Sequence, residues 1–115
     1  MNLIIKGELS IETESGLKIN PRIIDLLKLV QETGSLNTAV KEMGLSYSYI
    51  WNTLYKINCQ LNNPLLITQR GGKGGGVAYL TNSGIRLIKE YERMKKDFHQ
   101  FLEEHKVNLS SEKSL

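Results

Sequence analysis

The stretch from Arg70 to Gly84, RGGKGGGVAYLTNSG, is the first candidate for chemistry, because glycine and lysine dominate its start. Glycine-rich loops hold phosphates, but a Walker-type loop needs Ser or Thr directly after its lysine to reach a magnesium ion. Here Gly74 follows Lys73, and the required early glycine is missing. The spacing of a dinucleotide-binding loop also fails, because Val77 stands at its third glycine position. The stretch is therefore not predicted to bind a nucleotide.

The other reactive side chains do not predict an active site or a metal site. His99 and His105 are six residues apart and would lie on different sides of a helix, which suits two ligands of one metal ion poorly. Cys59 is the single cysteine and has no Cys or His at ligand spacing. No Ser/His/Asp set or carboxylate pair stands out. We therefore expect no enzyme activity, no metal and no cofactor.

The composition is that of a small soluble domain. The 115 residues are 40% hydrophobic and 23% charged, with a net charge of +3 and a pI of about 9.0. This balance permits nucleic-acid binding without requiring it. No apolar run approaches the ~18 residues of a membrane span, and no signal-type segment is recognisable. A single cysteine excludes an internal disulfide, so a cytoplasmic location is the default expectation.

Three short helices are predicted in the first half of the chain. The pair Asn20-Pro21 starts the first, which should end near Thr33 because Gly34 favours a left-handed stop. Two further segments show apolar residues at spacings of three and four, and each begins with a capping serine, Ser35 or Ser46. Only a short glycine turn joins these two segments. That arrangement is typical of a helix-turn-helix.

Strands are predicted on both sides of the helices. The first 19 residues alternate loosely and indicate a strand followed by a hairpin through the turn residues ETESG. Residues 65–69 (LLITQ) and 77–80 (VAYL) are rich in branched and aromatic residues, as strands are. The glycine-rich stretch between them fits a hairpin tip, since glycine permits positive φ and close approach to another surface. A helix-turn-helix followed by such a hairpin predicts a winged helix, an α+β fold that is mainly α.

A long last helix should start at Thr81. Its apolar residues advance in steps of four and three, and a repeat near 3.5 residues suits a partner helix. This seam consists of Leu87, Tyr91, Met94, Phe98 and Phe101. We expect a homodimer through the seam, with folding of the helix onto its own domain as the alternative. Residues 1–81 would form the winged helix-turn-helix, and residues 82–115 the dimerisation helix and a polar, frayed tail.

Two segments, TGSLNTAVKEMGLSYSYIWNTLYKIN and RGGKGGGVAYLTNSGIRLIKEYE, resemble the N-terminal DNA-binding domain of the ModE family of molybdate-responsive regulators, within the LysR-like winged-helix class. The resemblance covers roughly residues 21–102 and rests on Gly34-Ser35, Ser46-Tyr47 with Trp51, the glycine–lysine run, and Leu80-Thr81 with Gly84. It implies a dimeric, sequence-specific regulator of transcription that binds double-stranded DNA. Family members that sense molybdate have oxyanion-binding domains after the long helix, where this sequence ends. We therefore expect a free-standing DNA-binding part without a small-molecule ligand.

The third helix and the wing supply the candidate DNA contacts. On the helix these are Ser46, Tyr47, Ser48, Trp51, Asn52, Tyr55 and Lys56, and on the wing Arg70, Gly72, Lys73 and Gly74. Asn52 can pair with adenine, while Tyr47 and Trp51 can pack on sugars or thymine methyl groups. Burial of Trp51 against a neighbouring helix is the alternative, and burial is also expected for Tyr49. A winged-helix module that binds protein instead of DNA remains the competing hypothesis, because few cations lie on the third helix.

Overall fold

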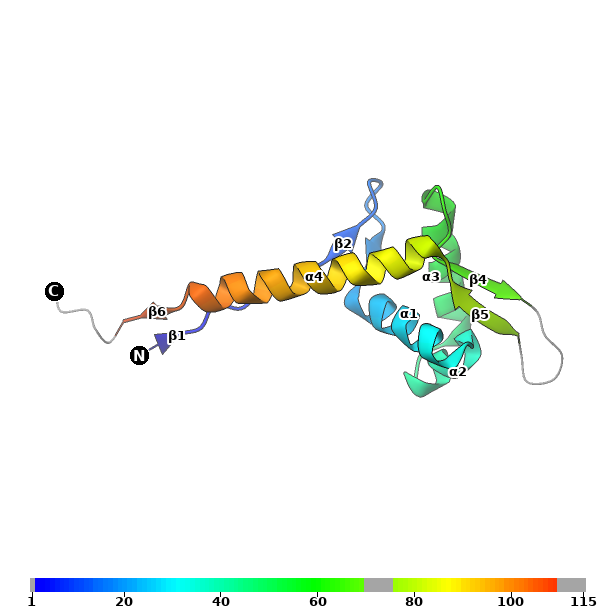
Figure 1. Cartoon of the computed structure of the whole chain (residues 1–115), viewed down its shortest axis with the longest axis horizontal. Coiled ribbons are helices and arrows are strands. Elements are labelled where there is room, and N and C mark those ends of the chain that lie inside the picture. The colour runs from blue at the N-terminus through cyan, green and yellow to red at the C-terminus, as the bar shows by residue number, and fades with distance from the viewer. Residues whose placement is uncertain (1, 70–75, 110–115) are drawn as a thin grey trace. The chain divides into compact units, whose positions relative to one another are not determined.

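The fold is mainly helical, with three small antiparallel sheets (Figure 1). The computed structural model describes residues 2–69 and 76–109. Within them the helices are α1 (Pro21–Thr33), α2 (Leu36–Glu42), α3 (Tyr47–Gln60) and α4 (Asn82–Glu104). The paired strands are β1 (Asn2–Leu3) with β6 (Val107–Asn108), β2 (Ile11–Glu12) with β3 (Lys18–Ile19), and β4 (Leu66–Gln69) with β5 (Val77–Leu80). The predicted α+β, mainly α fold of a winged helix is confirmed.

The chain forms two compact units. One is Ser10–Lys89, which contains α1, α2, α3 and the sheets β2–β3 and β4–β5. The other combines Met1–Leu9 with Glu90–Leu115 and contains the β1–β6 sheet. Helix α4 begins in the first unit and continues into the second.

The helices begin at the predicted capping residues. An N-cap oxygen satisfies a backbone N–H that has no partner within the helix, which favours a start at that position. The acceptors are Asn20 Oδ1 for Ile23 N–H at 3.2 Å, Ser35 Oγ for Thr38 at 3.1 Å, Ser46 Oγ for Tyr49 at 3.4 Å, and Thr81 Oγ1 for Gly84 at 3.1 Å. The predicted starts of all four helices are thus confirmed.

The turn after α1 connects the helices to the wing. Gly34 has a φ of 73°, in the left-handed region that ends helices, and its N–H bonds to the carbonyl of Val30 at 2.8 Å. The carbonyl of Gly34 accepts from the N–H of Ala78 in β5 at 2.9 Å. The start of β5 is therefore fixed against the α1–α2 turn.

The core of the larger unit lies between α1, α2, α3 and the inner face of the wing. Leu26, Leu27, Val30, Ala39 and Ile57 are completely buried. Ile50 and Leu54 on α3 join them, as the periodicity predicted. Removal of these side chains from water is the main favourable contribution to folding.

The wing sheet alternates between a buried and an exposed face. In β4 and β5 the buried face carries Leu66, Ala78 and Leu80, while Ile67, Val77 and Tyr79 are exposed. The register pairs Ile67 with Tyr79, so these two side chains share the outer face. The inner face thus ties the wing to the core, and the outer face remains open.

The smaller unit holds a strand pair that the sequence did not predict. Val107–Asn108 pairs with Asn2–Leu3, whereas this part of the tail was expected to fray. The prediction was wrong because a pairing across about a hundred residues leaves no local signal. The N-terminal hairpin was predicted, and it is formed by β2 and β3 around Gly16, whose φ is 93°.

Candidate nucleic-acid interface

The outer face of α3 carries the predicted candidate residues. Ser46 caps the helix, and Tyr47, Ser48, Trp51, Asn52, Tyr55 and Lys56 are all exposed. Their exposure follows from the burial of Ile50, Leu54 and Ile57 on the other face, since a helix of 3.6 residues per turn separates the two. The predicted residues therefore form one continuous surface along the helix.

Trp51 is exposed on this surface and is not buried against a neighbouring helix. Its exposed fraction is 44%, and that of Tyr55 is 57%. The two rings stack on each other with centroids 5.6 Å apart and an angle of 9° between their planes. Stacking at i and i+4 holds both rings in place, so the helix presents an ordered aromatic surface.

Tyr49 contradicts the expectation of burial, because 63% of its side chain is exposed. It precedes Ile50, which is buried, and lies about 100° away from it around the helix. A position next to Ile50 in the sequence does not bury Tyr49, because successive side chains of a helix point in different directions. Tyr49 is thus a surface residue that the sequence analysis missed.

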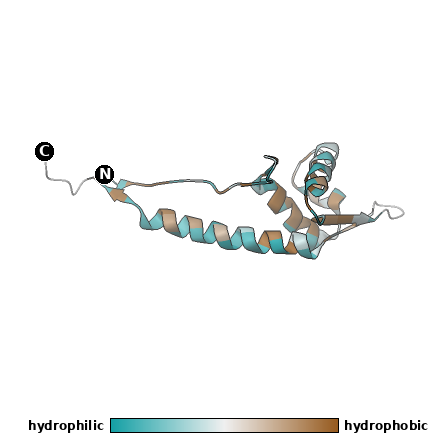
Figure 2. Cartoon of the chain, turned by 90° about the horizontal axis from the view of Figure 1, so that it is seen from above, coloured by the Kyte–Doolittle hydropathy of each residue, from teal (hydrophilic) through white to brown (hydrophobic). Residues whose placement is uncertain are grey.

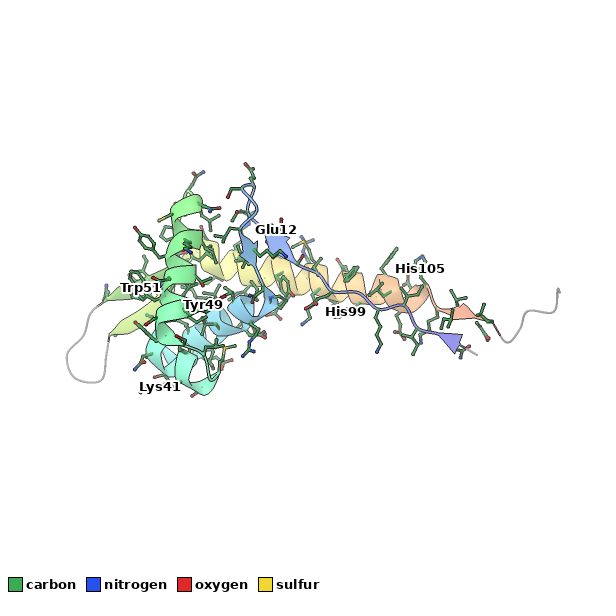
Figure 3. The ribbon with its side chains drawn as sticks, turned by 180° about the vertical axis from the view of Figure 1, so that it is seen from behind. Glu12, Lys41, Tyr49, Trp51, His99 and His105 are labelled. Atoms are coloured by element: carbon green, nitrogen blue, oxygen red, sulfur yellow. The ribbon has the colours of Figure 1, made fainter. Side chains whose placement is uncertain are left out.

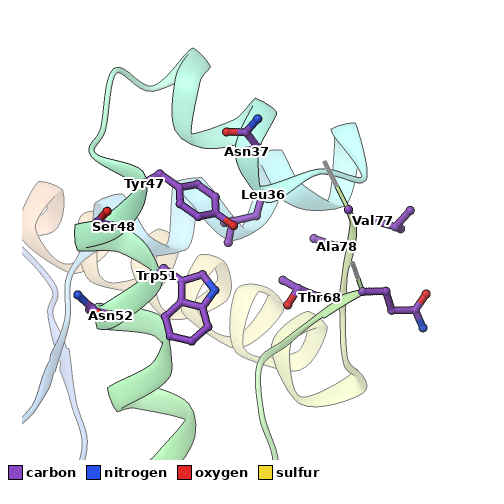
Figure 4. A pocket seen from close by; sticks show the side chains of 11 residues that line it. Leu36, Asn37, Tyr47, Ser48, Trp51, Asn52, Thr68, Val77 and Ala78 are labelled. Atoms are coloured by element: carbon purple, nitrogen blue, oxygen red, sulfur yellow. The ribbon is translucent and has the colours of Figure 1, made fainter. Parts of the chain in front are cut away.

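A groove runs along the first half of α3 and separates it from the wing strands (Figure 4). Its volume is about 610 Å³. The side walls come from the start of α2, from α3 and from the ends of β4 and β5. The lining residues are Leu36, Asn37, Tyr47, Ser48, Trp51, Asn52, Thr68, Gln69, Gly76, Val77 and Ala78. Four of the predicted residues of α3 therefore face the wing across one groove.

The described residues that line the groove are all uncharged. Aromatic rings come from Tyr47 and Trp51, and amides come from Asn37, Asn52 and Gln69. Asn37, Thr68 and Gln69 were not singled out in the sequence, because only the tertiary fold places α2, β4 and α3 around the same groove. Such a lining can contact sugars, base edges and thymine methyl groups by packing and neutral hydrogen bonds.

The predicted cationic tip of the wing lies outside the described residues. This applies to Arg70, Gly72, Lys73 and Gly74. Strands β4 and β5 are described up to Gln69 and from Val77, and both of these residues line the groove. The described ends of the two strands, Gln69 and Val77, therefore both lie at the groove.

The predicted dimer seam on α4 is mixed in exposure. Met94 is 40% exposed and Phe101 is 55% exposed, whereas Tyr91 is only 4% exposed within the single chain. Leu87 is half-buried. Phe98 is also half-buried and closely approaches Gly7, where a Cβ would lie 2.9 Å from the ring. Met94 and Phe101 are thus the seam residues that remain open.

Other kinds of site find little support in residues 2–69 and 76–109. These residues contain no group of three or more His, Cys, Asp and Glu side chains that could hold a metal ion. None of the helices described has the length and apolar character needed to cross a membrane.

The helix-turn-helix, the β4–β5 hairpin and the groove between them define a winged helix-turn-helix domain. No family model matches the sequence. The chain is 39% identical over 84 residues to the transcriptional regulator ModE of Yersinia pestis, which covers 73% of this chain and 32% of the relative. It is 36% identical over 106 residues to ModE of Haemophilus influenzae, covering 90% and 42%.

A third relative, the molybdenum transport protein ModE of Azotobacter vinelandii, is 30% identical over 97 residues, covering 84% of this chain and 36% of the relative. Over 73–90% of its length the chain is therefore similar to ModE proteins. It spans between 32% and 42% of the length of these relatives. The first two are named as transcriptional regulators and not as enzymes, in agreement with the prediction that the chain is not an enzyme.

Proposed function

We propose that this chain is the DNA-binding part of a ModE-type transcriptional regulator that acts in the cytoplasm and recognises double-stranded DNA by sequence. The observation that supports this most directly is the continuous exposed face of α3, which opens onto a groove shared with the wing. The names of the relatives point to the same function. In this proposal α3 enters the major groove, which is wide enough for a helix.

Different residues of α3 and the wing would contact different parts of the DNA. Ser48 and Asn52 lie on the outermost part of the helix and would meet base edges, with the Asn52 amide suited to adenine. Tyr47 and Trp51 would pack on sugars or thymine methyl groups at the groove. Arg70 and Lys73 would bind phosphates from the wing, because phosphate contacts position a protein on its duplex without reading sequence.

The first prediction is a steep dependence of duplex binding on salt. Each phosphate that a cation neutralises contributes a slope of about −0.9 to the plot of log affinity against log salt. With about six such contacts, affinity should fall by roughly a thousandfold between 50 and 200 mM salt. A mobility-shift titration on a duplex selected from a random pool would measure this. A flat salt response, or absence of a shift at low salt, would refute DNA binding.

The second prediction separates base contacts from phosphate contacts. Asn52→Ala should cost about 1–3 kcal/mol at a selected site and relax the choice of base there. Lys73→Ala should weaken binding to all sequences about equally and lower the salt slope by about one. Binding of both variants would be compared on the selected duplex and on unrelated duplexes. If Lys73→Ala changed base preference without changing the slope, the wing would not be a phosphate contact.

A protein-binding winged helix is the second candidate function. The outer face of α3 favours it in one respect, because Tyr47, Trp51 and Tyr55 are aromatic and only Lys56 among the predicted helix contacts is a cation. Interfaces between proteins are enriched in such aromatic residues. The salt titration distinguishes the two functions, since a protein-binding module would not shift mixed duplex DNA at low salt.

We also propose that the chain forms a homodimer. Support comes from the smaller unit, which exposes large apolar side chains despite its small size. These are Leu3, Ile4, Ile5, Met94, Phe101, Val107 and Leu109. Large apolar side chains exposed in so small a unit are candidates for burial in an assembly. A second copy of the chain would bury them and would place two α3 helices about 34–36 Å apart, one turn of DNA.

The third prediction is that these 115 residues do not bind molybdate by themselves. A tetrahedral oxyanion needs converging N–H, hydroxyl or cationic donors in a closed site. The residues described along the groove beside α3 are uncharged, and in our proposal the groove is open to DNA. Calorimetry with molybdate should show no binding at micromolar concentrations. Micromolar binding that sulfate does not compete away would contradict this prediction.

A further inference from the structure

Tyr49 occupies a fixed place on α3 without contributing to the core. Its N–H donates to Ser46 Oγ at 3.4 Å, and its carbonyl accepts from Thr53 Oγ1 at 2.8 Å, so the backbone at this position is held by the cap and by the next turn. The side chain is 63% exposed, the most of any tyrosine or tryptophan on the helix. Within the part of the chain that the structure describes, its hydroxyl has no hydrogen bond.

Tyr49 lies on the edge of α3 that faces away from the groove. Successive residues of a helix are about 100° apart, so Tyr49 and Trp51 are separated by about 160° around the axis. Figure 3 shows the two side chains on opposite sides of α3. Trp51 lines the groove, whereas Tyr49 does not. Ser48 and Asn52, the proposed base contacts, lie on the face between these two edges.

Lys56 shares the edge of Tyr49. The two residues are seven positions apart, which places them within about 20° of each other around the axis and about 10 Å apart along it. Lys56 is exposed as well. This edge of α3 therefore carries a phenol and an ammonium group, both of them hydrogen-bond donors.

The width of the major groove gives this edge a partner. The major groove of B-DNA is about 12 Å wide, and a helix with its side chains has a diameter of about 10–12 Å. A helix that fills the major groove therefore approaches a sugar–phosphate backbone on each side. Tyrosine hydroxyls and lysine ammonium groups are common donors to phosphate oxygens.

We propose that Tyr49 is a phosphate-binding residue and that, with Lys56, it forms a second line of backbone contacts on the edge of α3 opposite the wing. This inference rests on the proposed DNA-binding function. The wing edge and the Tyr49 edge would then hold the two strands that border the major groove. The phenol O–H would donate a hydrogen bond to a phosphate oxygen, and the ring of Tyr49 would lie against the neighbouring sugar.

The test is Tyr49→Phe, which removes only the hydroxyl group. Loss of a hydrogen bond to a charged oxygen should weaken binding about tenfold on a selected duplex and on unrelated duplexes alike. The salt slope should stay as in the wild type, because no cation is lost. Lys56→Gln should instead lower the slope by about one. Phosphate-ethylation interference should show one phosphate whose modification harms the wild type but not the Tyr49→Phe protein.

Tyr79→Phe is the matched control, because Tyr79 is an exposed tyrosine of the same unit, on the outer face of the wing. The Tyr79→Phe protein is predicted to bind DNA like the wild type. Thermal melting of each variant checks that the fold is retained. If Tyr49→Phe binds within twofold of the wild type, or loses affinity for one sequence only, the inference is overturned while DNA binding stands. If the wild type binds no duplex, the proposed function itself fails.

Discussion

Gly84→Ala is expected to lower the free energy of unfolding by about 3 kcal/mol, a large effect for a single methyl group. A Cβ at this position would lie 2.2 Å from the carbonyl oxygen of Leu65, which is backbone and cannot rotate away. The same oxygen accepts from the N–H of Thr81 at 3.1 Å. A shift that makes room for the methyl group would therefore break the contact between the start of α4 and the connection from α3 to β4.

This junction has further hydrogen bonds that depend on the same spacing. Thr81 Oγ1 donates to the carbonyl of Pro64 at 2.6 Å and accepts from the N–H of Gly84. Asn58 Oδ1 accepts from the N–H of Leu65 at 3.0 Å, which holds the junction to α3. These hydrogen bonds, together with the close approach of Gly84 to Leu65, connect the start of α4 to the proposed recognition helix α3.

Chemical denaturation followed by circular dichroism would measure the effect of Gly84→Ala. Asn82→Ala is the control, because Asn82 is exposed in the same first turn of α4 and alanine is a good helix former. The control should stay within about 0.5 kcal/mol of the wild type. Equal stability of Gly84→Ala and the wild type would show that the backbone at Leu65 moves freely.

The double substitution of Met94 and Phe101 by Asp is expected to convert the proposed homodimer into a monomer. Both side chains are exposed apolar members of the seam, and a dimer would bury two new carboxylates per chain against a second copy. Burial of unpaired charge costs far more than a typical apolar contact contributes. Phe98 is a poor choice for this experiment, because its ring packs near Gly7 and its loss would disturb the chain itself.

Sedimentation equilibrium at micromolar concentrations would show the change in mass. Lys95→Asp with His99→Asp is the control, since both residues are exposed on another side of α4 and introduce the same number of carboxylates. Figure 2 shows hydrophilic and hydrophobic residues alternating along this helix. A wild-type protein that is monomeric, or a double variant that stays dimeric, would rule out this interface.

The agreement between sequence and structure is best where the signals are local. Asn20, Ser35, Ser46 and Thr81 were identified as helix caps, and each accepts its hydrogen bond from a residue three positions later. The bounds of α1 agree with the prediction to the residue. Capping, periodicity and turn chemistry involve neighbours in the chain, so they can be recognised in the sequence without knowledge of the fold.

The sequence by itself determined the four helices, the wing strands, the residues of α3 that turn outward and the resemblance to the ModE family. The tertiary structure decided four other features: the exposure of Tyr49, the position of Asn37, Thr68 and Gln69 in the groove, the pairing of β1 with β6, and the close approach of Gly84 to Leu65. The last three depend on atoms that packing brings together from distant parts of the chain, whereas Tyr49 is exposed because no described segment packs over it. A contact between two such segments depends on the shapes of both, so the sequence around either segment alone does not predict it.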